Sequence, residues 1–353
     1  MSKVVGFTWT VEDENLITYH AIYGDTLVRL GRADPRIVVV TADLGNSTRI
    51  ERFKRAFPDR FFNVGVAEQN MTAVAAGLAA SGLRPVISSY AVFASLRAAE
   101  FVRADLAYNQ RNVTILGTLA GVSFGQGGPT HHAIEDMALM RAIPSMVVMA
   151  PCDGHQTGWA LEAALAHEGP AYVRIGRSME PLVYQDPDSR FQLGRASVVR
   201  ASARATDDQV TVIACGVAVY HALAAAERAQ RQGVAVRVLD MHTIKPLDTE
   251  AVQRAMIETG RIVTAEDHNV IGGLGTAVAE VIAESSADLG VTCRLRRLGH
   301  DDRFSPMGIP EDLVHRAGFD DDGILAAILD LAERPRNGAT ASRATSSPPE
   351  ETS

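Results

Sequence analysis

A single carboxylate stands where a short apolar segment gives way to a helix-forming one. Glu68 lies in the run 65–71, and residues 60–64 before it have the apolar and β-branched content of a buried strand. Residues 71–80 after it are small and Ala-rich, which favours a helix. An acid at such a junction lies in the crevice where α/β sheets hold ligands, and its chemistry suits proton transfer. The same position also suits an acid that only stabilises a helix N-terminus.

A glycine-rich turn with two adjacent histidines forms a second candidate. Residues 125–132 read Gly-Gln-Gly-Gly-Pro-Thr-His-His and follow an expected strand at 113–118. Glycines let backbone approach a ligand closely, and histidine exchanges protons near neutral pH. Adjacent side chains point in different directions, and no Cys, Asp or Glu completes a ligand set, so we predict no metal site here. Taken alone, the segment also fits an exposed structural turn.

Composition narrows the classes of partner. The 353 residues are 46% hydrophobic and carry a formal net charge of −8, without any Lys/Arg-rich run. This balance argues against nucleic acid or an acidic membrane surface and favours a small-molecule substrate or a protein partner. Cys152, Cys215 and Cys293 are odd in number and not spaced for zinc, which fits a reducing cytoplasm. No apolar leader or bilayer-length segment is evident, so we expect a cytoplasmic protein.

The elements that must position these residues alternate along the chain. Strand patterns and helix patterns follow one another with short connections from about residue 16 to 175, and again from 210 to 298; one of the expected helices runs over 94–109. Such alternation predicts an α/β fold of two consecutive domains, each a mostly parallel sheet flanked by helices. The expected units are an N-terminal arm at 1–15, a first domain at 16–185, a linker at 186–195, a second domain at 196–335 and a disordered tail at 336–353.

Five short motifs occur in an order that we recognise. They are Thr41-Ala42-Asp43-Leu44, Gly65-Val66-Ala67-Glu68, Gly128-Pro129-Thr130-His131, the run Asp-Met-His-Thr-Ile-Lys-Pro-Leu-Asp at 240–248, and Glu266-Asp267-His268 followed by Ile-Gly-Gly-Leu-Gly at 271–275. Over about residues 16–335 the chain resembles the C-terminal half of transketolase, as made by organisms that split the enzyme into two subunits. The resemblance implies a pyrimidine-binding domain followed by a transketolase C-terminal-like domain.

The resemblance also implies thiamine diphosphate as cofactor and transfer of a two-carbon ketol unit from a ketose to an aldehyde. Glu68 matches the acid that hydrogen-bonds the aminopyrimidine ring and so promotes loss of the proton from the thiazolium carbon. Tyr90 and Phe93 match aromatic residues that stack on the pyrimidine, although a core-facing helix pair is the alternative. Asp43 and Leu44 are expected on the cofactor side of the site.

Other matched residues face the substrate. His131 matches a histidine that contacts sugar hydroxyls or helps proton transfer, and we expect it to be catalytic. Ser47 and Arg177 match positions that bind the terminal phosphate, which suits a hydroxyl donor and a guanidinium fork. His20 stands where many transketolases have a phosphate-binding arginine, so a fixed charge has become a titratable one.

Two further departures affect the expected substrate. Gly127 replaces an aspartate that contacts substrate hydroxyls, and Leu119 replaces a histidine near the reacting carbon. The pocket should therefore be less polar than in an ordinary transketolase. We expect a sugar or keto substrate that is not handled like a common pentose or hexose phosphate.

One expected part of such an enzyme is missing from the sequence. Members of the superfamily hold Mg2+ and the diphosphate with a Gly-Asp-Gly followed some thirty residues later by Asn, and no such pair occurs here. The oxygen ligands for the metal must then come from another polypeptide. We therefore expect a partner subunit with the diphosphate-binding domain, in an α2β2 assembly.

Alternative functions remain open at this point. The β subunit of a 2-oxo acid dehydrogenase E1 has similar length and an equivalent acid, but Gly-Pro-Thr-His followed by Ile134-Glu135 favours transketolase. A fragment of 1-deoxyxylulose-phosphate synthase is conceivable through Ala67-Glu68-Gln69. A non-catalytic structural partner that keeps the fold is less consistent with the presence of Glu68.

Overall fold

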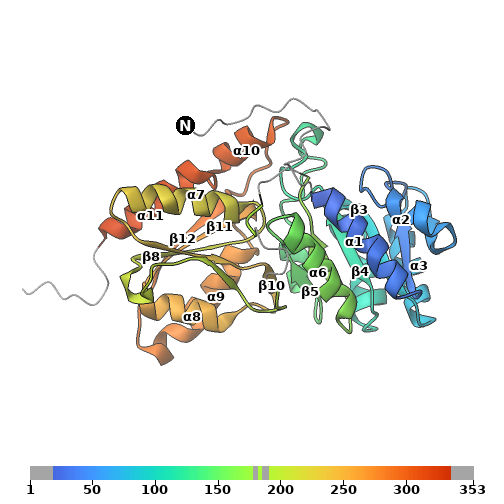
Figure 1. Cartoon of the computed structure of the whole chain (residues 1–353), viewed down its shortest axis with the longest axis horizontal. Coiled ribbons are helices and arrows are strands. Elements are labelled where there is room, and N and C mark those ends of the chain that lie inside the picture. The colour runs from blue at the N-terminus through green and yellow to red at the C-terminus, as the bar shows by residue number, and fades with distance from the viewer. Residues whose placement is uncertain (1–18, 178–181, 185–190, 335–353) are drawn as a thin grey trace, which may run out of the picture.

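The computed structural model shows two α/β domains side by side (Figure 1). It describes residues 19–177, 182–184 and 191–334, without the side chains of 19–22 and 205. The expected arm, the expected tail and residues 186–190 of the expected linker lie outside the described residues. The first domain runs from blue to green in Figure 1, and the second from yellow to red.

The first domain is built on a seven-stranded sheet in the order β10-β5-β6-β4-β3-β1-β2. All neighbouring strands are parallel except β10, which pairs antiparallel with β5. Strands β1, β4 and β6 are buried along their whole length, as expected when helices cover both faces of a parallel sheet. The strands are β1 (Ile37–Thr41), β2 (Phe61–Asn63), β3 (Arg84–Tyr90), β4 (Thr114–Thr118), β5 (Val147–Met149), β6 (Ala171–Arg174) and β10 (Thr243–Lys245).

Alternating side chains of these strands serve two separate cores. Val39, Val86 and Leu116 belong to a cluster with residues of α1 (Tyr19–Ala33), α2 (Glu51–Ala56) and α6 (Gly154–Ala166). Val40 and Ile87 point the other way, to a cluster with α3 (Glu68–Ala80) and α5 (Asp136–Ala142) that continues into the second domain. The period of two along each strand thus divides the helices between the two faces.

The second domain has a five-stranded sheet in the order β12-β11-β8-β9-β7, parallel except for β7. Helices α7 (Ala218–Arg231) and α11 (Asp321–Glu333) cover one face, and α8 (Thr249–Glu258) and α9 (Leu274–Leu289) the other (Figure 1). The remaining elements are β7 (Ser197–Arg200), β8 (Val210–Ala214), β9 (Val236–Asp240), β11 (Arg261–Asn269), β12 (Arg294–His300) and α10 (Pro310–Ala317).

Three local differences from the sequence expectation fall near Glu68. Strand β2 ends at Asn63, because the chain turns through Gly65 at φ 76°. Helix α3 begins at Glu68 itself rather than at Met71. The helix expected at 94–109 is interrupted by π-helical turns, η2 (Phe93–Arg97) and η3 (Val102–Ala107), on either side of α4 (Ala99–Phe101). Such turns take an extra residue, which hydrophobic periodicity does not reveal.

None of the described helices is both long and apolar enough to span a bilayer.

The carboxyl ends of β1, β3 and β4 lie at one edge of the first sheet. The segments that leave this edge carry Asp43, the π-helical turn η2 and the loop 119–135 with His131. Strand β2 runs parallel to β1, so the turn from β2 to Glu68 leaves the sheet at the same edge.

Candidate active site

Glu68 is a buried acid paired with a single guanidinium. It is the first residue of α3, and its residue exposure is 1%. Its Oε2 accepts a hydrogen bond from Arg97 Nη1 at 3.0 Å, while the Arg97 side chain keeps 44% of its surface exposed. The carboxyl group thus lies at a helix N-terminus and against a guanidinium, two surroundings that suit an acid. The site therefore holds a carboxylate away from bulk water, next to a cation that still reaches solvent.

Two aromatic rings extend the site from Arg97. Tyr90 ends β3 and Phe93 opens η2, and their rings stack with centroids 5.9 Å apart and an interplanar angle of 24°. The Arg97 guanidinium carbon lies 4.5 Å from the centroid of Phe93, within cation–π range. Both aromatic residues are half-buried, so they present flat apolar surface at the edge of the sheet rather than in the core.

His131 reaches the same rings from the loop after β4. Its ring is 5.4 Å from Phe93 and 6.1 Å from Tyr90, between centroids, and 5.8 Å from Phe124. Thr130 Oγ1 lies 2.9 Å from His131 Nδ1. His132 turns away and is buried, with Nε2 3.3 Å from Gly125 O, and burial lowers its pKa. The two adjacent histidines therefore have different surroundings, and His131 alone faces the aromatic cluster.

Asp43 and Leu44 shape the turn beside Glu68 instead of joining the rings. Asp43 adopts a φ of 62° and exchanges two hydrogen bonds with Asn63, at 2.8 and 3.0 Å. Asn63 Oδ1 also accepts from Gly65 N at 3.1 Å, and Leu44 N donates to Thr41 Oγ1 at 3.3 Å. These bonds tie the ends of β1 and β2 to the turn that leads into α3.

The residues expected at the anionic end of a substrate are only partly assembled. The Arg177 guanidinium carbon lies 4.5 Å from the Phe124 ring centroid, and burial lowers the Arg177 pKa, helped by the positive charge of Arg49. Ser47 is exposed on the turn before Ile50, and no contact joins it to the rings among the described residues. The side chain of His20 lies outside the described residues.

The structure gives a physical reason for one departure from the family pattern. A Cβ at Gly127 would lie 2.5 Å from Phe124 and 2.9 Å from the Cβ of His131, so the turn leaves no room for a side chain there. Leu119 is 2% exposed and has a φ of 56°. Neither position therefore brings a polar side chain to the site.

Three residues of the site were not singled out from the sequence. Arg97 follows Phe93 by four residues, a helical spacing that could have suggested a shared face. Phe124 lies in an irregular loop, where no periodicity exists to reveal it. Arg49 has a φ of 58° in a tight turn, a conformation that its residue type does not predict.

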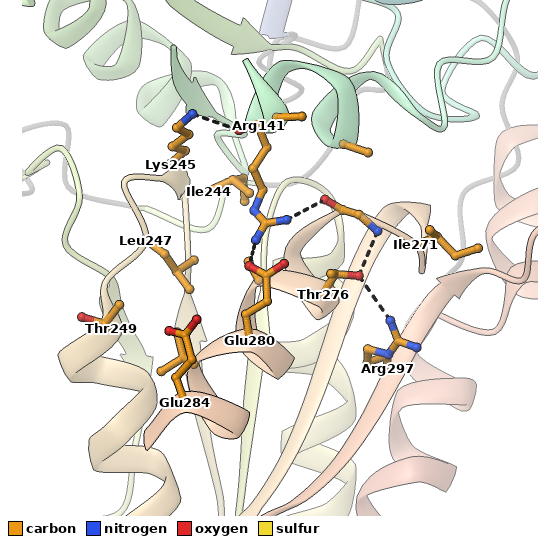
Figure 2. A pocket seen from close by; sticks show the side chains of 15 residues that line it. Arg141, Ile244, Lys245, Leu247, Thr249, Ile271, Thr276, Glu280, Glu284 and Arg297 are labelled. Carbon is orange, nitrogen blue, oxygen red and sulfur yellow. Dashed lines mark hydrogen bonds and ion pairs between the residues drawn. The ribbon is translucent and has the colours of Figure 1, made fainter. Parts of the chain in front are cut away.

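Figure 2 shows a cavity of about 920 Å3 that lies elsewhere, between the domains. It is lined by α5, β10 and α9, with Arg141 paired to Glu280 and Lys245 Nζ donating to the carbonyls of Arg141 and Ile143. Arg141 and Lys245 therefore both bond to other groups of the protein. None of the residues that line the cavity belongs to the cluster around Glu68.

One group of clustered metal-ligating side chains occurs in the described part of the chain, formed by His315, Asp320 and Asp322. It lies in the second domain at the α10–α11 turn, where Asp320 caps α11 and His315 Nδ1 lies 2.6 Å from Asp320 Oδ2. Asp320 is thus explained by capping and by its pairing with His315, and Asp322 by its ion pair with Arg228. The site around Glu68 has no such group of hard oxygen ligands in the described residues.

The fold and the cluster define a class: a two-domain α/β protein that keeps a buried acid and an aromatic cradle at the carboxyl edge of a parallel sheet. Models of known families identify the two domains. The transketolase pyrimidine-binding domain matches residues 15–181, and the transketolase C-terminal domain matches residues 200–324. The chain belongs to the transketolase family.

Two of the relatives have lengths similar to that of this chain. An apulose-4-phosphate transketolase subunit of Phocaeicola vulgatus is 38% identical over 91% of this chain and 99% of its own. The 6-deoxy-6-sulfo-D-fructose transketolase subunit of a Clostridium species is 40% identical over 88% of this chain and 94% of its own. Human transketolase is 38% identical over 88% of this chain, which corresponds to 48% of the human protein.

A solved structure of a split-gene transketolase, described as an inactive beta4 tetramer, superposes with a TM-score of 0.78 at 41% identity. The match covers 90% of this chain and 98% of the other. The fold class expected from the sequence is confirmed, and so is the resemblance to the C-terminal subunit of a split transketolase.

Proposed function

We propose that this chain is the catalytic-acid half of a thiamine diphosphate-dependent transketolase, which moves a two-carbon ketol unit from a ketose donor to an aldehyde acceptor. The observation that carries the proposal is the buried Glu68 carboxylate, bonded to Arg97, whose guanidinium lies over the Phe93 ring. Tyr90 and His131 pack against that same ring. The proposed domain bounds are 16–185 and 196–335.

The residues present fit the pyrimidine end of the cofactor. An acid that is 1% exposed can share a proton with a ring nitrogen, because burial strengthens that bond. The half-buried residues Tyr90 and Phe93 offer a flat face on which a heteroaromatic ring can stack. Thiamine diphosphate, when bound, supplies the carbon nucleophile and the electron sink.

The substrate would contact His131, and its anionic end would contact Arg177. The His131 ring packs against both Tyr90 and Phe93, the two aromatic residues proposed to hold the cofactor. It can donate or accept a proton at the reacting centre or hold a hydroxyl. Arg177, with Ser47 and His20, would hold the anionic end of the substrate.

A second subunit is part of the proposal. The chain has no Gly-Asp-Gly…Asn pattern, and the described residues offer no oxygen-rich metal site near Glu68. We infer that a diphosphate-binding subunit supplies the Mg2+ ligands and that the assembly is α2β2. Two findings support this inference: the match to about half of human transketolase, and the similarity to a split-gene transketolase described as an inactive beta4 tetramer.

The substrate is proposed to be a non-standard sugar or keto compound. Gly127 and Leu119 replace polar groups, and His20 replaces a fixed positive charge, which lowers the polarity expected of the pocket. Relatives named for apulose-4-phosphate and for 6-deoxy-6-sulfo-D-fructose are consistent with altered substrate choice in such subunits. The proposed compartment is the cytoplasm, which the odd number and wide spacing of the cysteines support.

Reconstitution tests the proposal. The chain is mixed with a diphosphate-binding transketolase subunit, thiamine diphosphate and Mg2+, and ketol transfer is assayed with a panel of ketose donors and aldehyde acceptors. We expect activity only in the mixture, and turnover of common ketose phosphates well below that of a housekeeping transketolase. Robust activity of the chain alone would overturn the proposed subunit division, and efficient use of common ketose phosphates would overturn the proposed substrate choice.

A further inference from the structure

The loop 119–132 carries two of the four rings of the site but little regular structure of its own. It leaves β4 through Leu119 and Gly121, which both have positive φ, and its longest regular element is a single 3-10 turn, Gly125–Gly127. Gly121 N donates to Ala133 O at 2.9 Å and closes the base of the loop. A loop of this kind needs outside contacts to hold Phe124 and His131 in one place.

Those contacts come from the second domain. Asp267, near the end of β11, accepts the backbone N–H of Val122 with both carboxylate oxygens, at 3.2 and 3.1 Å. The carboxylate also lies against Gly121, where a Cβ would come within 1.9 Å of Asp267 Oδ2. Asp267 is 5% exposed, so these are contacts of a buried group.

His300, at the end of β12, holds Asp267 in turn. His300 Nε2 lies 2.9 Å from Asp267 Oδ1, and His300 Nδ1 lies 3.2 Å from Ser305 Oγ. Burial alone would raise the pKa of Asp267, but the hydrogen bond and charge of His300 and the charge of Arg174 lower it. The carboxylate that faces the loop is therefore kept ionised and fixed in orientation.

The segment after His300 holds the far side of the loop. Gly308 N donates to Gly125 O at 3.1 Å, and the Met307 side chain lies 3.7 Å from the Cβ position of Gly128. The loop is thus held at Val122 by one strand end of the second domain and at Gly125 by the chain that follows the next strand. Phe124 lies between these two points, and His131 lies further along the loop, after Gly125.

We propose that Asp267 and His300 are positioning residues that clamp the loop 119–132, so that the second domain sets where His131 meets the rings of Tyr90 and Phe93. The importance of this clamp for catalysis rests on the proposed function, but the clamp itself does not. It is a direct contact between the second domain and the loop that carries Phe124 and His131. It also gives a role to Asp267 of the Glu266-Asp267-His268 motif.

Amide hydrogen exchange of the full chain tests the clamp directly. In Asp267→Asn the weaker acceptor should speed exchange in the peptide that covers 119–135 by about tenfold or more, the loss expected for a charged hydrogen bond. Asp208→Asn is the matched control, because Asp208 is also a fully buried acid of the second domain, bonded to Ser202 and Arg237. The control should leave the 119–135 peptide within about twofold of the parent. Equal exchange in the parent and Asp267→Asn would overturn the proposal.

A second pair of variants keeps the test valid if Asp267→Asn does not fold. His300→Gln keeps an N–H that can reach Asp267, whereas His300→Leu removes it. We expect near-parent exchange in His300→Gln and fast exchange in His300→Leu. In the histidine NMR spectrum, the His131 resonance, assigned by its loss in His131→Asn, should move toward its free-peptide position in His300→Leu and not in His300→Gln. Identical spectra for the two variants would contradict the clamp.

The reconstituted enzyme separates this proposal from the proposed function. There Asp267→Asn should lower kcat by about tenfold while the apparent KM for thiamine diphosphate stays within about twofold. Faster loop exchange in an assembly without ketol transfer would leave the clamp standing and remove the proposed function. Undiminished kcat in Asp267→Asn would show that the clamp does not position His131 for catalysis.

Discussion

At the scale of single residues, Glu68 and Arg97 form the ion pair of the candidate site. A carboxylate that is 1% exposed needs a charge partner or donors, and Arg97 Nη1 at 3.0 Å is the partner that the structure provides. The same guanidinium lies 4.5 Å from the Phe93 ring centroid. Arg97 therefore contacts two of the groups that we propose bind the cofactor's pyrimidine, Glu68 and Phe93.

Replacing Arg97 tests this pairing. In Arg97→Met the buried Glu68 loses its cation, and we expect a loss of about 1–2 kcal/mol in the free energy of unfolding, less than for a fully buried pair because Arg97 is half exposed. Urea denaturation measures it. In the Glu68→Gln background the same substitution should cost much less, since no charge is left unpaired. An equal cost in both backgrounds would show that the ion pair contributes nothing.

At the scale of elements, the sequence predicts the strands and helices that local residue patterns define. It does not predict contacts between segments that are far apart in the chain. The alternation of strands and helices is visible because buried parallel strands are continuous apolar runs, as in β1 and β4. The addition of β10 to the first sheet is not visible, because its pairing with β5 joins segments about a hundred residues apart. Glu68 and His131 could be chosen from motif and residue type. For Arg97 the sequence offers only its helical spacing from Phe93, and Phe124 could not be chosen, because it lies in an irregular loop.

The loop gives a prediction about the departure at Gly127. Restoring the family's aspartate with Gly127→Asp should lower the melting temperature and weaken reconstituted activity on every substrate, because its Cβ would clash with Phe124 and His131. We expect a cost of about 1–3 kcal/mol. Gln126→Asp, one residue earlier and exposed, adds the same charge without the clash and should be nearly neutral. Gain of ketose phosphate turnover in Gly127→Asp would contradict this prediction and show that the loop accommodates the aspartate.

At the scale of the whole molecule, buried titratable groups contribute to the pH dependence of stability, and two acids of the second domain have raised pKa values. Burial raises the pKa of Asp240 from 3.8 to about 7, against the hydrogen bonds of Tyr184 and Gln156. Burial likewise raises the pKa of Glu266 from 4.5 to about 7. For both acids the folded state binds a proton more tightly, so their contribution is present at low pH and is lost as the pH rises through about 7.

Two buried histidines have the opposite effect on how the free energy of unfolding changes with pH. They therefore determine the pH range in which the acids are best measured. Burial lowers the pKa of His242 and of His268 from 6.5 to about 4, so their contribution is lost as the pH falls below 6.5. Above pH 6.5 the two acids outweigh these two histidines, and each acid lowers the free energy of unfolding toward pH 8, by at most about 1.4 kcal/mol per pH unit for each proton. Burial also lowers the pKa of His132 and of His221, which adds a slope of opposite sign, so the difference between the parent and Asp240→Asn isolates one acid. Urea titrations at about pH 6.5, 7.2 and 8 should show that stability changes more favourably with rising pH in Asp240→Asn than in the parent. Equal slopes in the two proteins would refute the assignment.

The last prediction concerns the assembled enzyme, because in the proposed function Glu68 meets a complete cofactor only when a partner subunit holds the diphosphate. Exchange of the thiazolium carbon's proton for deuterium, followed by NMR after acid quench, reports whether the acid activates the ring, independently of which substrate is used. In the reconstituted assembly we expect fast exchange, slowed by about a hundredfold or more in Glu68→Gln, which keeps the shape but not the basicity. Exchange as fast in Glu68→Gln as in the parent assembly would contradict the central claim that Glu68 is the acid that activates the cofactor.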